Sequence, residues 1–165
     1  MSGAPPRPGA IGTARSDPSI RPAATADLDA VRACVREAYA PYVARIGREP
    51  APMTADYADL IGRGEVWVAD EAGRVVGVLV LRPGATALLL ENVAVVPERQ
   101  GRGIGRVLIA FAERKARDLG LTEISLYTNE RMVENIHLYR KLGYVETDRR
   151  VEDGFARVFF RKPID

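Results

Sequence analysis

The sequence predicts a single mixed α/β domain with both antiparallel and parallel strands in its central sheet. Three observations support this expectation. Apolar runs of strand length alternate along the 165-residue chain with helix-length stretches that carry one apolar face. Some strands follow each other across short glycine turns, whereas others are connected through helices, and only a mixed sheet accommodates both connections. An apolar fraction of 47% is enough for one core at this length.

The first elements precede the sheet centre. A short strand is expected at 19–23, and Thr25 then fits an N-cap with Asp27 in the first helical turn. The spacing of the apolar residues that follow predicts a helix, which Pro41 should end or bend. A second, short helix is predicted from Thr54 to Ile61, because the sequence GRG follows it.

The remaining elements build the sheet. Strands at 65–70 and 75–82 flank the turn EAGR and form a hairpin. The run ALLLENVAVV (87–96) is nearly continuously apolar, which predicts a central strand buried on both faces. A helix begins near Ile104, with an apolar stripe that ends at Leu119 and with Gly120 as its C-cap. A strand at 123–128, a helix at 133–142 and a terminal strand pair complete the domain.

These elements make six to seven strands, mostly antiparallel, with about four flanking helices. We expect the domain at residues 19–165, after a tail at 1–18 whose bias toward Pro, Gly, Ala and Ser indicates disorder and no secretory signal. No segment is long and apolar enough to cross a bilayer, so a cytoplasmic protein without membrane contact is expected.

The composition argues against several classes of function. The chain has 24 basic and 22 acidic residues and a formal net charge of +2, which gives no reason to expect a nucleic-acid partner. Cys34 is the only cysteine and His137 the only histidine. We therefore expect no internal disulfide, no zinc site built from several thiolates and no bound metal.

The stretch ENVAVVPERQGRGIGRVL (91–108) is the most informative part of the chain. A strand ends at a proline, and three glycines interleaved with arginines then lead into a helix. Free N–H groups and the helix dipole at such a place bind anions, and glycines allow a ligand to approach the backbone. The loop has neither the GK[ST] of a nucleotide-triphosphate P-loop nor the spacing of a dinucleotide fingerprint. It suits a diphosphate, and the alternative is a plain glycine-rich connection.

At these residues the sequence resembles the GNAT (Gcn5-related) N-acetyltransferases. Gln100, Gly103 and Gly105 match the family signature Q/R-x-x-G-x-G/A, and the preceding strand is similar to the family's fourth strand. The segment ENIHLYRKLGYVE resembles the family's later helix and strand, and the element order agrees over residues of about 19 to 162.

The resemblance implies that acetyl-CoA is the donor and an amine the acceptor. In the family the fourth strand pairs with the pantetheine amides, which corresponds here to Val93, Ala94 and Val95. The diphosphate would bind at Gln100, Gly101, Arg102, Gly103, Ile104, Gly105 and Arg106. The family also separates its fourth and fifth strands, and we expect the same between Val95 and Leu126. Such a separation leaves a strand edge free for an extended ligand.

Two residues are candidate catalysts. Tyr139 matches the family tyrosine near the thioester sulfur, and a phenol with an ordinary pKa of about 10 suits a general acid. The alternative is a tyrosine packed in the core. Glu91, a carboxylate in an otherwise apolar strand, is a candidate general base that acts directly or through water. The alternative is a structural partner for an arginine.

The sequence departs from the family pattern near Tyr139. Met132 stands where the motif often has Asn, and we expect Asn135 to provide a CoA contact and Asn129 to cap the turn. Tyr127 occupies a position that is often Glu in ribosomal-protein acetyltransferases, which argues against that subgroup.

Further residues have weaker assignments. Cys34 is expected to be a packed core thiol, which favours direct transfer in a ternary complex over an acetyl-cysteine route. His137 is expected on the solvent side of its helix. Tyr39, Tyr42 and Trp67 are candidate walls of the acceptor pocket, and each is equally compatible with the core.

Three functions follow from this reading. The first is an acetyl-CoA-dependent N-acetyltransferase that acts, as a monomer or homodimer, on a small-molecule or peptide amine. The second is a non-catalytic acyl-CoA-binding or regulatory module. The third, a nucleotide-binding protein, is disfavoured because the P-loop lysine is missing.

Overall fold

The computed structural model describes residues 17–165, so most of the predicted N-terminal tail lies outside the described residues. One seven-stranded sheet has the order β1-β2-β3-β4-β5-β7-β6. All neighbours pair antiparallel except β4 and β5, which are parallel. The strands are β1 (Ser19–Pro22), β2 (Val66–Glu71), β3 (Arg74–Pro83), β4 (Ala87–Val95), β5 (Glu123–Asn129), β6 (Val145–Glu152) and β7 (Phe155–Pro163). The predicted mixed sheet is thus confirmed.

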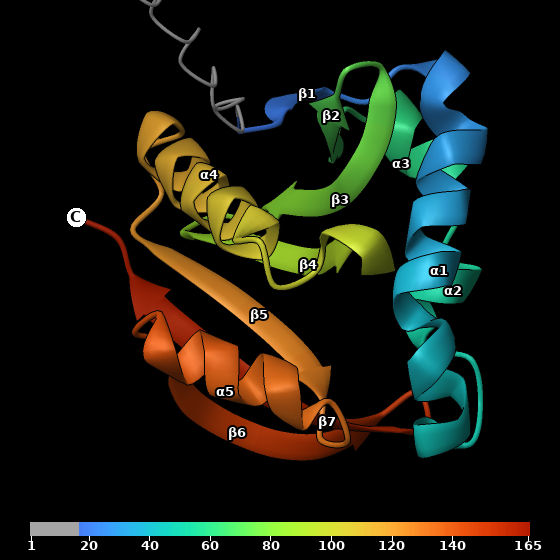
Figure 1. Ribbon diagram of the computed structural model, residues 1–165. Coiled ribbons are helices and arrows are strands. Elements are labelled where there is room, and N and C mark those ends of the chain that lie inside the picture. Colours follow the sequence, from blue (N-terminus) through green and yellow to red (C-terminus); the bar gives the residue numbers. More distant parts are fainter. Residues whose placement is uncertain (1–16) are drawn as a thin grey trace, which may run out of the picture.

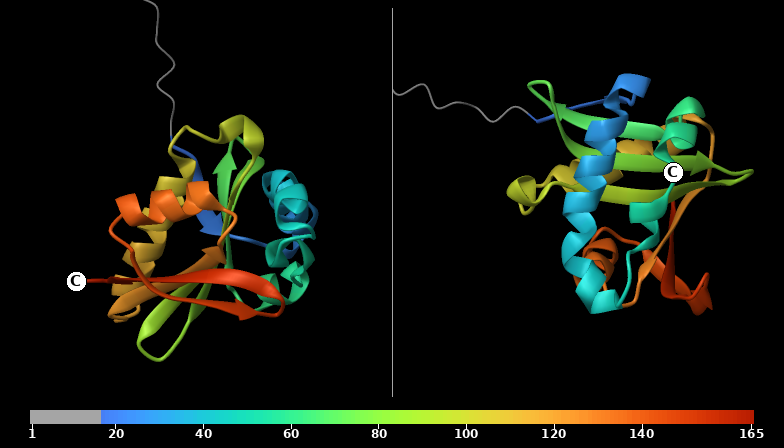
Figure 2. Two further views of the ribbon diagram at one scale, coloured as in Figure 1. Left: turned by 90° about the horizontal axis from the view of Figure 1, so that it is seen from below. Right: turned by 90° about the vertical axis from the view of Figure 1, so that its right-hand side faces the viewer.

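Helices cover both faces of this sheet (Figures 1 and 2). One face carries α4 and α5, and the other carries the three N-terminal helices. The helices are α1 (Leu28–Ile46), α2 (Ala51–Thr54), α3 (Tyr57–Gly62), α4 (Ile104–Asp118) and α5 (Val133–Lys141). No helix within residues 17–165 combines the length and the apolar character that a membrane span requires.

The N-terminal helices differ from the sequence-based expectation. The first helix does not end at Pro41 but continues to Ile46. Pro41 is exposed, so the carbonyl that loses its helical hydrogen bond can be hydrated. The predicted helix from Thr54 to Ile61 is replaced by α2 and α3. The Asp56 side chain accepts a hydrogen bond from Asp59 N (3.1 Å) and starts α3 as its N-cap.

The central strand β4 is half-buried and not buried on both faces as predicted. Leu88, Leu90, Asn92 and Ala94 are buried, and the residues between them are partly exposed. The alternation also includes Ala87 and Leu89, which lie in the half of β4 that pairs with β5, so alternate side chains along the whole strand are less completely covered. On α4 the buried stripe includes Leu108 and Ala112, but Leu119, predicted to belong to it, is 53% exposed because the helix has already ended.

Candidate active site

The strands β4 and β5 separate in the middle of the sheet. Their pairing runs from Ala87↔Glu123 to Leu90↔Leu126 and continues no further. Figure 1 shows the two strands diverging toward their C-terminal ends. The predicted separation between Val95 and Leu126 is therefore present. It leaves the C-terminal half of β4 with a free edge inside the molecule.

A β-bulge marks the point of separation. On the β3 side, Asn92 pairs with Val80 and Leu90 pairs with Leu81, so Glu91 is the extra residue without a partner. Bulges re-aim side chains and end regular pairing, and they are frequent beside active sites. Glu91 consequently occupies the first position of β4 after the strands part.

The free edge of β4 presents backbone groups to the gap. Val96 N donates to Val76 O (3.0 Å), which fixes the alternation of the antiparallel ladder with β3. The N–H and C=O groups of Val93 and Val95 therefore point away from β3. Two side chains reach these carbonyls: the Tyr39 hydroxyl oxygen lies 3.2 Å from Val93 O, and Gln100 Nε2 donates to Val95 O (3.0 Å).

The glycine loop connects this edge to α4. Gly103 is the N-cap of α4 with a left-handed backbone (φ 84°), a conformation that glycine adopts without strain. A Cβ atom built at Gly101, Gly103 or Gly105 would meet nothing within 4 Å, so open space surrounds the loop. Arg106 is exposed in the first turn of α4, whereas Arg99 is held by an ion pair with Glu71 (2.9 Å).

The free edge, the loop and α5 enclose a cavity of about 610 Å³. Most of the predicted cofactor and acceptor residues line it, whereas Arg102 and Glu91 do not. The predicted residues in its wall are Val93, Ala94, Val95, Gln100, Gly101, Gly103, Ile104, Gly105, Arg106, Asn135, Tyr39, Tyr42 and Tyr139.

Tyr139 of α5 is buried in the wall of this cavity. Its ring packs at 5.9 Å from the Tyr144 centroid and 6.0 Å from that of Phe160. Burial raises the pKa of Tyr139 to about 12, with a smaller contribution from Tyr42. Within the part of the chain that the structure describes, its hydroxyl makes no hydrogen bond. The hydroxyl is therefore a protonated and uncommitted donor at neutral pH.

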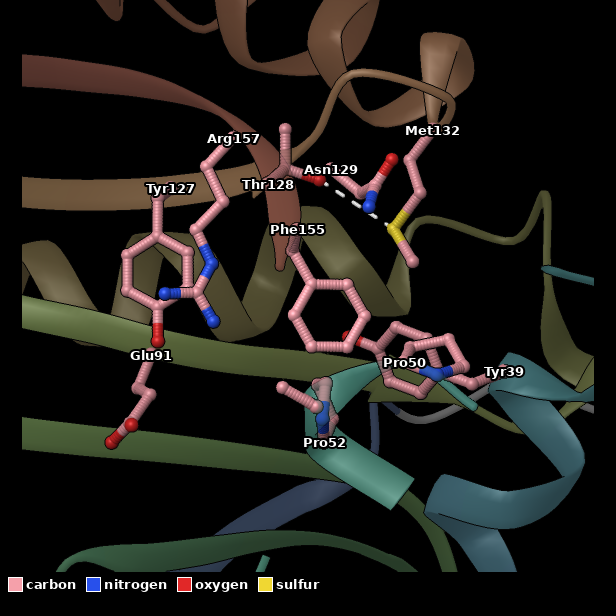
Figure 3. Close-up of a pocket in the computed structure, with 11 residues that line it drawn as sticks. Tyr39, Pro50, Pro52, Glu91, Tyr127, Thr128, Asn129, Met132, Phe155 and Arg157 are labelled. Carbon is pink, nitrogen blue, oxygen red and sulfur yellow. Dashed lines mark hydrogen bonds between the residues drawn. The ribbon is translucent and has the colours of Figure 1, made fainter. Parts of the chain in front are cut away.

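A smaller pocket lies on the other side of Tyr39, which lines both spaces (Figure 3). Glu91 reaches this pocket and not the larger cavity. Its carboxylate is 27% exposed and lies 3.4 Å from Arg82 Nη1. In Figure 3 the side chain is directed away from Phe155 and Tyr39. Glu91 thus combines an arginine partner with a position in the pocket wall.

The structure also contains site residues that the sequence reasoning missed. Asn92 is buried beside the bulge and links two helices to β4. The Tyr39 hydroxyl donates to Asn92 Oδ1 (2.5 Å), and Asn92 Nδ2 donates to the Tyr57 hydroxyl (3.1 Å). The only signal in the sequence was an amide in an apolar strand. Arg157, a buried residue in the wall of the smaller pocket, gave no signal of its own.

The turn before α5 follows the prediction. Asn129 accepts a hydrogen bond from Arg131 N through its side chain (2.9 Å) and caps the turn as expected. Asn135 faces the large cavity, and its amide approaches Met132 Sδ (3.6 Å). Met132 is buried and takes the place of the family asparagine.

The other predicted side chains separate into core and surface. Cys34 is a buried thiol as expected, and burial raises its pKa to about 12. His137 is exposed on α5, also as expected. Trp67 packs on Phe111 of α4 (4.9 Å between ring centroids), which agrees with its core alternative.

Known proteins share this arrangement. Residues 62–146 match the family described as "Acetyltransferase (GNAT) domain". N-acetyltransferase family 8 member 2 of Rattus norvegicus is 32% identical over 58% of this chain and 47% of its own length. The chain thus spans about half the length of the curated relatives it matches.

Solved structures share the fold. The PaiA N-acetyltransferase of Thermoplasma acidophilum, in complex with coenzyme A, superposes with a TM-score of 0.77 at 21% identity and covers 88% of this chain and 98% of its own. The ribosomal-protein-S18-alanine N-acetyltransferase of Escherichia coli has a TM-score of 0.72 at 22% identity. The match covers 88% of this chain and 93% of that protein's chain. With the family match over more than half of its residues, the chain belongs to the GNAT acetyltransferase family.

Proposed function

We propose that the protein transfers an acetyl group from acetyl-CoA to a primary amine by direct transfer in a ternary complex. One observation carries the proposal: a free strand edge, a glycine loop at a helix N-terminus and an uncommitted tyrosine hydroxyl meet in one cavity. An extended chain with two amides needs a free strand edge, and a diphosphate needs a helix N-terminus. A departing thiolate needs a proton donor such as the tyrosine hydroxyl.

The residues of the cavity fit acetyl-CoA. The N–H and C=O groups of Val93 and Val95 are directed into the gap and can pair with the pantetheine amides. For this pairing, the Tyr39 and Gln100 side chains would have to give up their contacts with the two carbonyl oxygens. The first N–H groups of α4, with Gly101, Gly103 and Gly105, would hold the diphosphate. Arg106 adds a full positive charge, and Asn135 is available to the acyl arm.

The chemistry then requires two proton movements. The amine nitrogen forms a bond to the thioester carbonyl carbon, and the C–S bond breaks. Tyr139 donates its proton to the leaving sulfur, and solvent returns a proton to the phenolate. The amine proton leaves to water, with Glu91 as the proposed final acceptor beyond a water molecule. Cys34 is buried and protonated, which supports direct transfer without an acetyl-cysteine.

The alternative is a non-catalytic acyl-CoA-binding module with the same fold. Thermal denaturation is the first test: acetyl-CoA should raise the melting temperature, and ATP and NAD should not. Release of free CoA thiol with a panel of amines is the second. Stabilisation by acetyl-CoA without thiol release or N-acetylation would replace the enzyme by the binding module. Equal stabilisation by ATP would reject both.

A further inference from the structure

Arg157 is a buried cation in the wall of the smaller pocket. It belongs to β7, pairs across the sheet with Asn129 of β5, and is only 8% exposed. Its neighbours in the pocket include Tyr127, Phe155, Pro50 and Pro52 (Figure 3). A buried guanidinium beside prolines and aromatic rings is costly unless an anion shares the site.

The surrounding groups hold the guanidinium and leave one of its edges free. Arg157 Nη1 donates to Glu152 Oε2 (3.1 Å) and lies 3.5 Å from Asp153. Its Cζ atom lies 4.4 Å from the Tyr127 ring centroid and 5.6 Å from that of Phe155. Among the described residues, Nε and Nη2 have no hydrogen-bond partner. Arg157 lines the pocket, and neither atom is fully buried, because the one fully buried polar side-chain atom without a partner in residues 17–165 is Glu65 Oε2.

One of the two carboxylates is shared with a second arginine, and the other is exposed to solvent. Glu152 also accepts a hydrogen bond from Arg150 (2.9 Å), and Asp153 is 83% exposed. Solvent therefore screens the second pair strongly. The free Nε–Nη2 edge is a planar pair of donors, which matches the two oxygens of a carboxylate.

We propose that the acceptor is a free amino acid with an apolar side chain, whose carboxylate binds Arg157 and whose side chain contacts Phe155 and the two prolines. The inference rests on the proposed function. Tyr39 lines both spaces, so an amine at that end of the pocket lies one side chain away from the large cavity. A polyamine would bring a second positive charge against Arg157, and a peptide N-terminus would offer it a neutral amide.

The test compares acceptors that differ only at the carboxylate. L-Phenylalanine, L-phenylalaninamide and phenethylamine share one body, and leucine, leucinamide and isoamylamine form a second set. For each acceptor, kcat/KM is referred to the concentration of its unprotonated amine at the assay pH. We expect this value for each acid to exceed that of the corresponding amide and amine by about 10- to 100-fold. Spermidine and a lysine peptide complete the panel.

The outcomes distinguish a failure of the carboxylate assignment from a failure of the proposed acetyltransferase activity. Acetylation of amides, spermidine or the peptide at the same or higher kcat/KM overturns the carboxylate assignment and keeps the acetyltransferase. Binding of acetyl-CoA without transfer to any amine overturns the acetyltransferase itself.

Variants give a second readout. Arg157→Gln should reduce the acid-to-amide ratio to about 1 through KM of the acid, and Arg157→Lys should restore part of it. The control is Arg161→Gln on the same strand, whose exposed side chain lies 3.7 Å from Glu123, and it should keep the ratio. An unchanged ratio in a folded Arg157→Gln protein overturns the proposal. The wild-type ratio decides the question alone if that variant does not fold.

Discussion

Replacing Tyr139 by phenylalanine removes one hydroxyl and leaves the packing in place. The ring stays against Tyr144 and Phe160. Among the described residues the hydroxyl has no hydrogen-bond partner, so its removal leaves no group unsatisfied. We therefore expect the free energy of unfolding to change by less than about 1 kcal/mol, the scale of one net hydrogen bond. Acetyl-CoA affinity should change little, because the diphosphate and pantetheine sites lie elsewhere in the cavity.

The effect on turnover should be much larger. Because burial holds the pKa of Tyr139 at about 12, roughly one hydroxyl in 10⁵ is ionised at pH 7, and the side chain is available as an acid. General acid catalysis contributes about 10²- to 10⁴-fold, which is about 3–5 kcal/mol of barrier. Turnover of Tyr139→Phe should fall by this factor.

The assay measures thiol release for kcat, calorimetry for the dissociation constant of acetyl-CoA and urea denaturation for stability. Tyr144→Phe is the matched control, since Tyr144 is also buried on the same cluster but its hydroxyl contacts Glu113 Oε1 (3.1 Å). That variant should lose stability and keep kcat. Equal losses of kcat and affinity in Tyr139→Phe would identify a packing role, and an unchanged kcat would refute acid catalysis by this residue.

Three further predictions concern stability, each measured by urea denaturation. Asn92→Ala leaves the Tyr39 and Tyr57 hydroxyls without their shared partner and should cost about 1–3 kcal/mol, so wild-type stability would contradict the network. Gly77→Val should cost about 1–3 kcal/mol, because a Cβ there already meets Leu108 Cδ1 at 3.0 Å; a neutral result would mean that α4 shifts freely. Burial raises the pKa of Tyr39 and Tyr57 above the unfolded value of about 10, so stability should hold up to about pH 10 and fall as the pH rises further; constant stability to pH 12 would contradict their burial.

Much of the fold could be predicted because its signals are local. The hairpin turn, the helix start after the glycine loop and the apolar stripe of α4 all arise from residues a few positions apart. The family motifs lie on β4, the loop and α5, and most of their predicted residues line the large cavity. The sequence left open whether Pro41 ends or bends the helix, because helix termination at a proline depends on exposure, which the neighbouring residues do not encode.

The rest of the site depends on long-range pairing. Asn92 meets Tyr39 and Tyr57 from 53 and 35 positions away, so no local pattern joins them. Arg157 reaches the pocket only because β7 pairs with β5 in a register that sets it opposite Asn129. The gap beside β4 has the same origin, because it depends on where β5 departs.

The central claim is that acetyl-CoA binds with its diphosphate at the start of α4, and calorimetry with two glycine variants tests it most directly. Gly103→Glu places a strained, negatively charged side chain in the open space beside the loop. Gly120→Glu makes the same change at the other end of α4, where the backbone is also left-handed (φ 70°) and space is open. We predict that wild type and Gly120→Glu bind acetyl-CoA alike and that Gly103→Glu binds at least about 10-fold more weakly, a difference of about 1.4 kcal/mol. Equal affinity of Gly103→Glu and wild type would contradict the account.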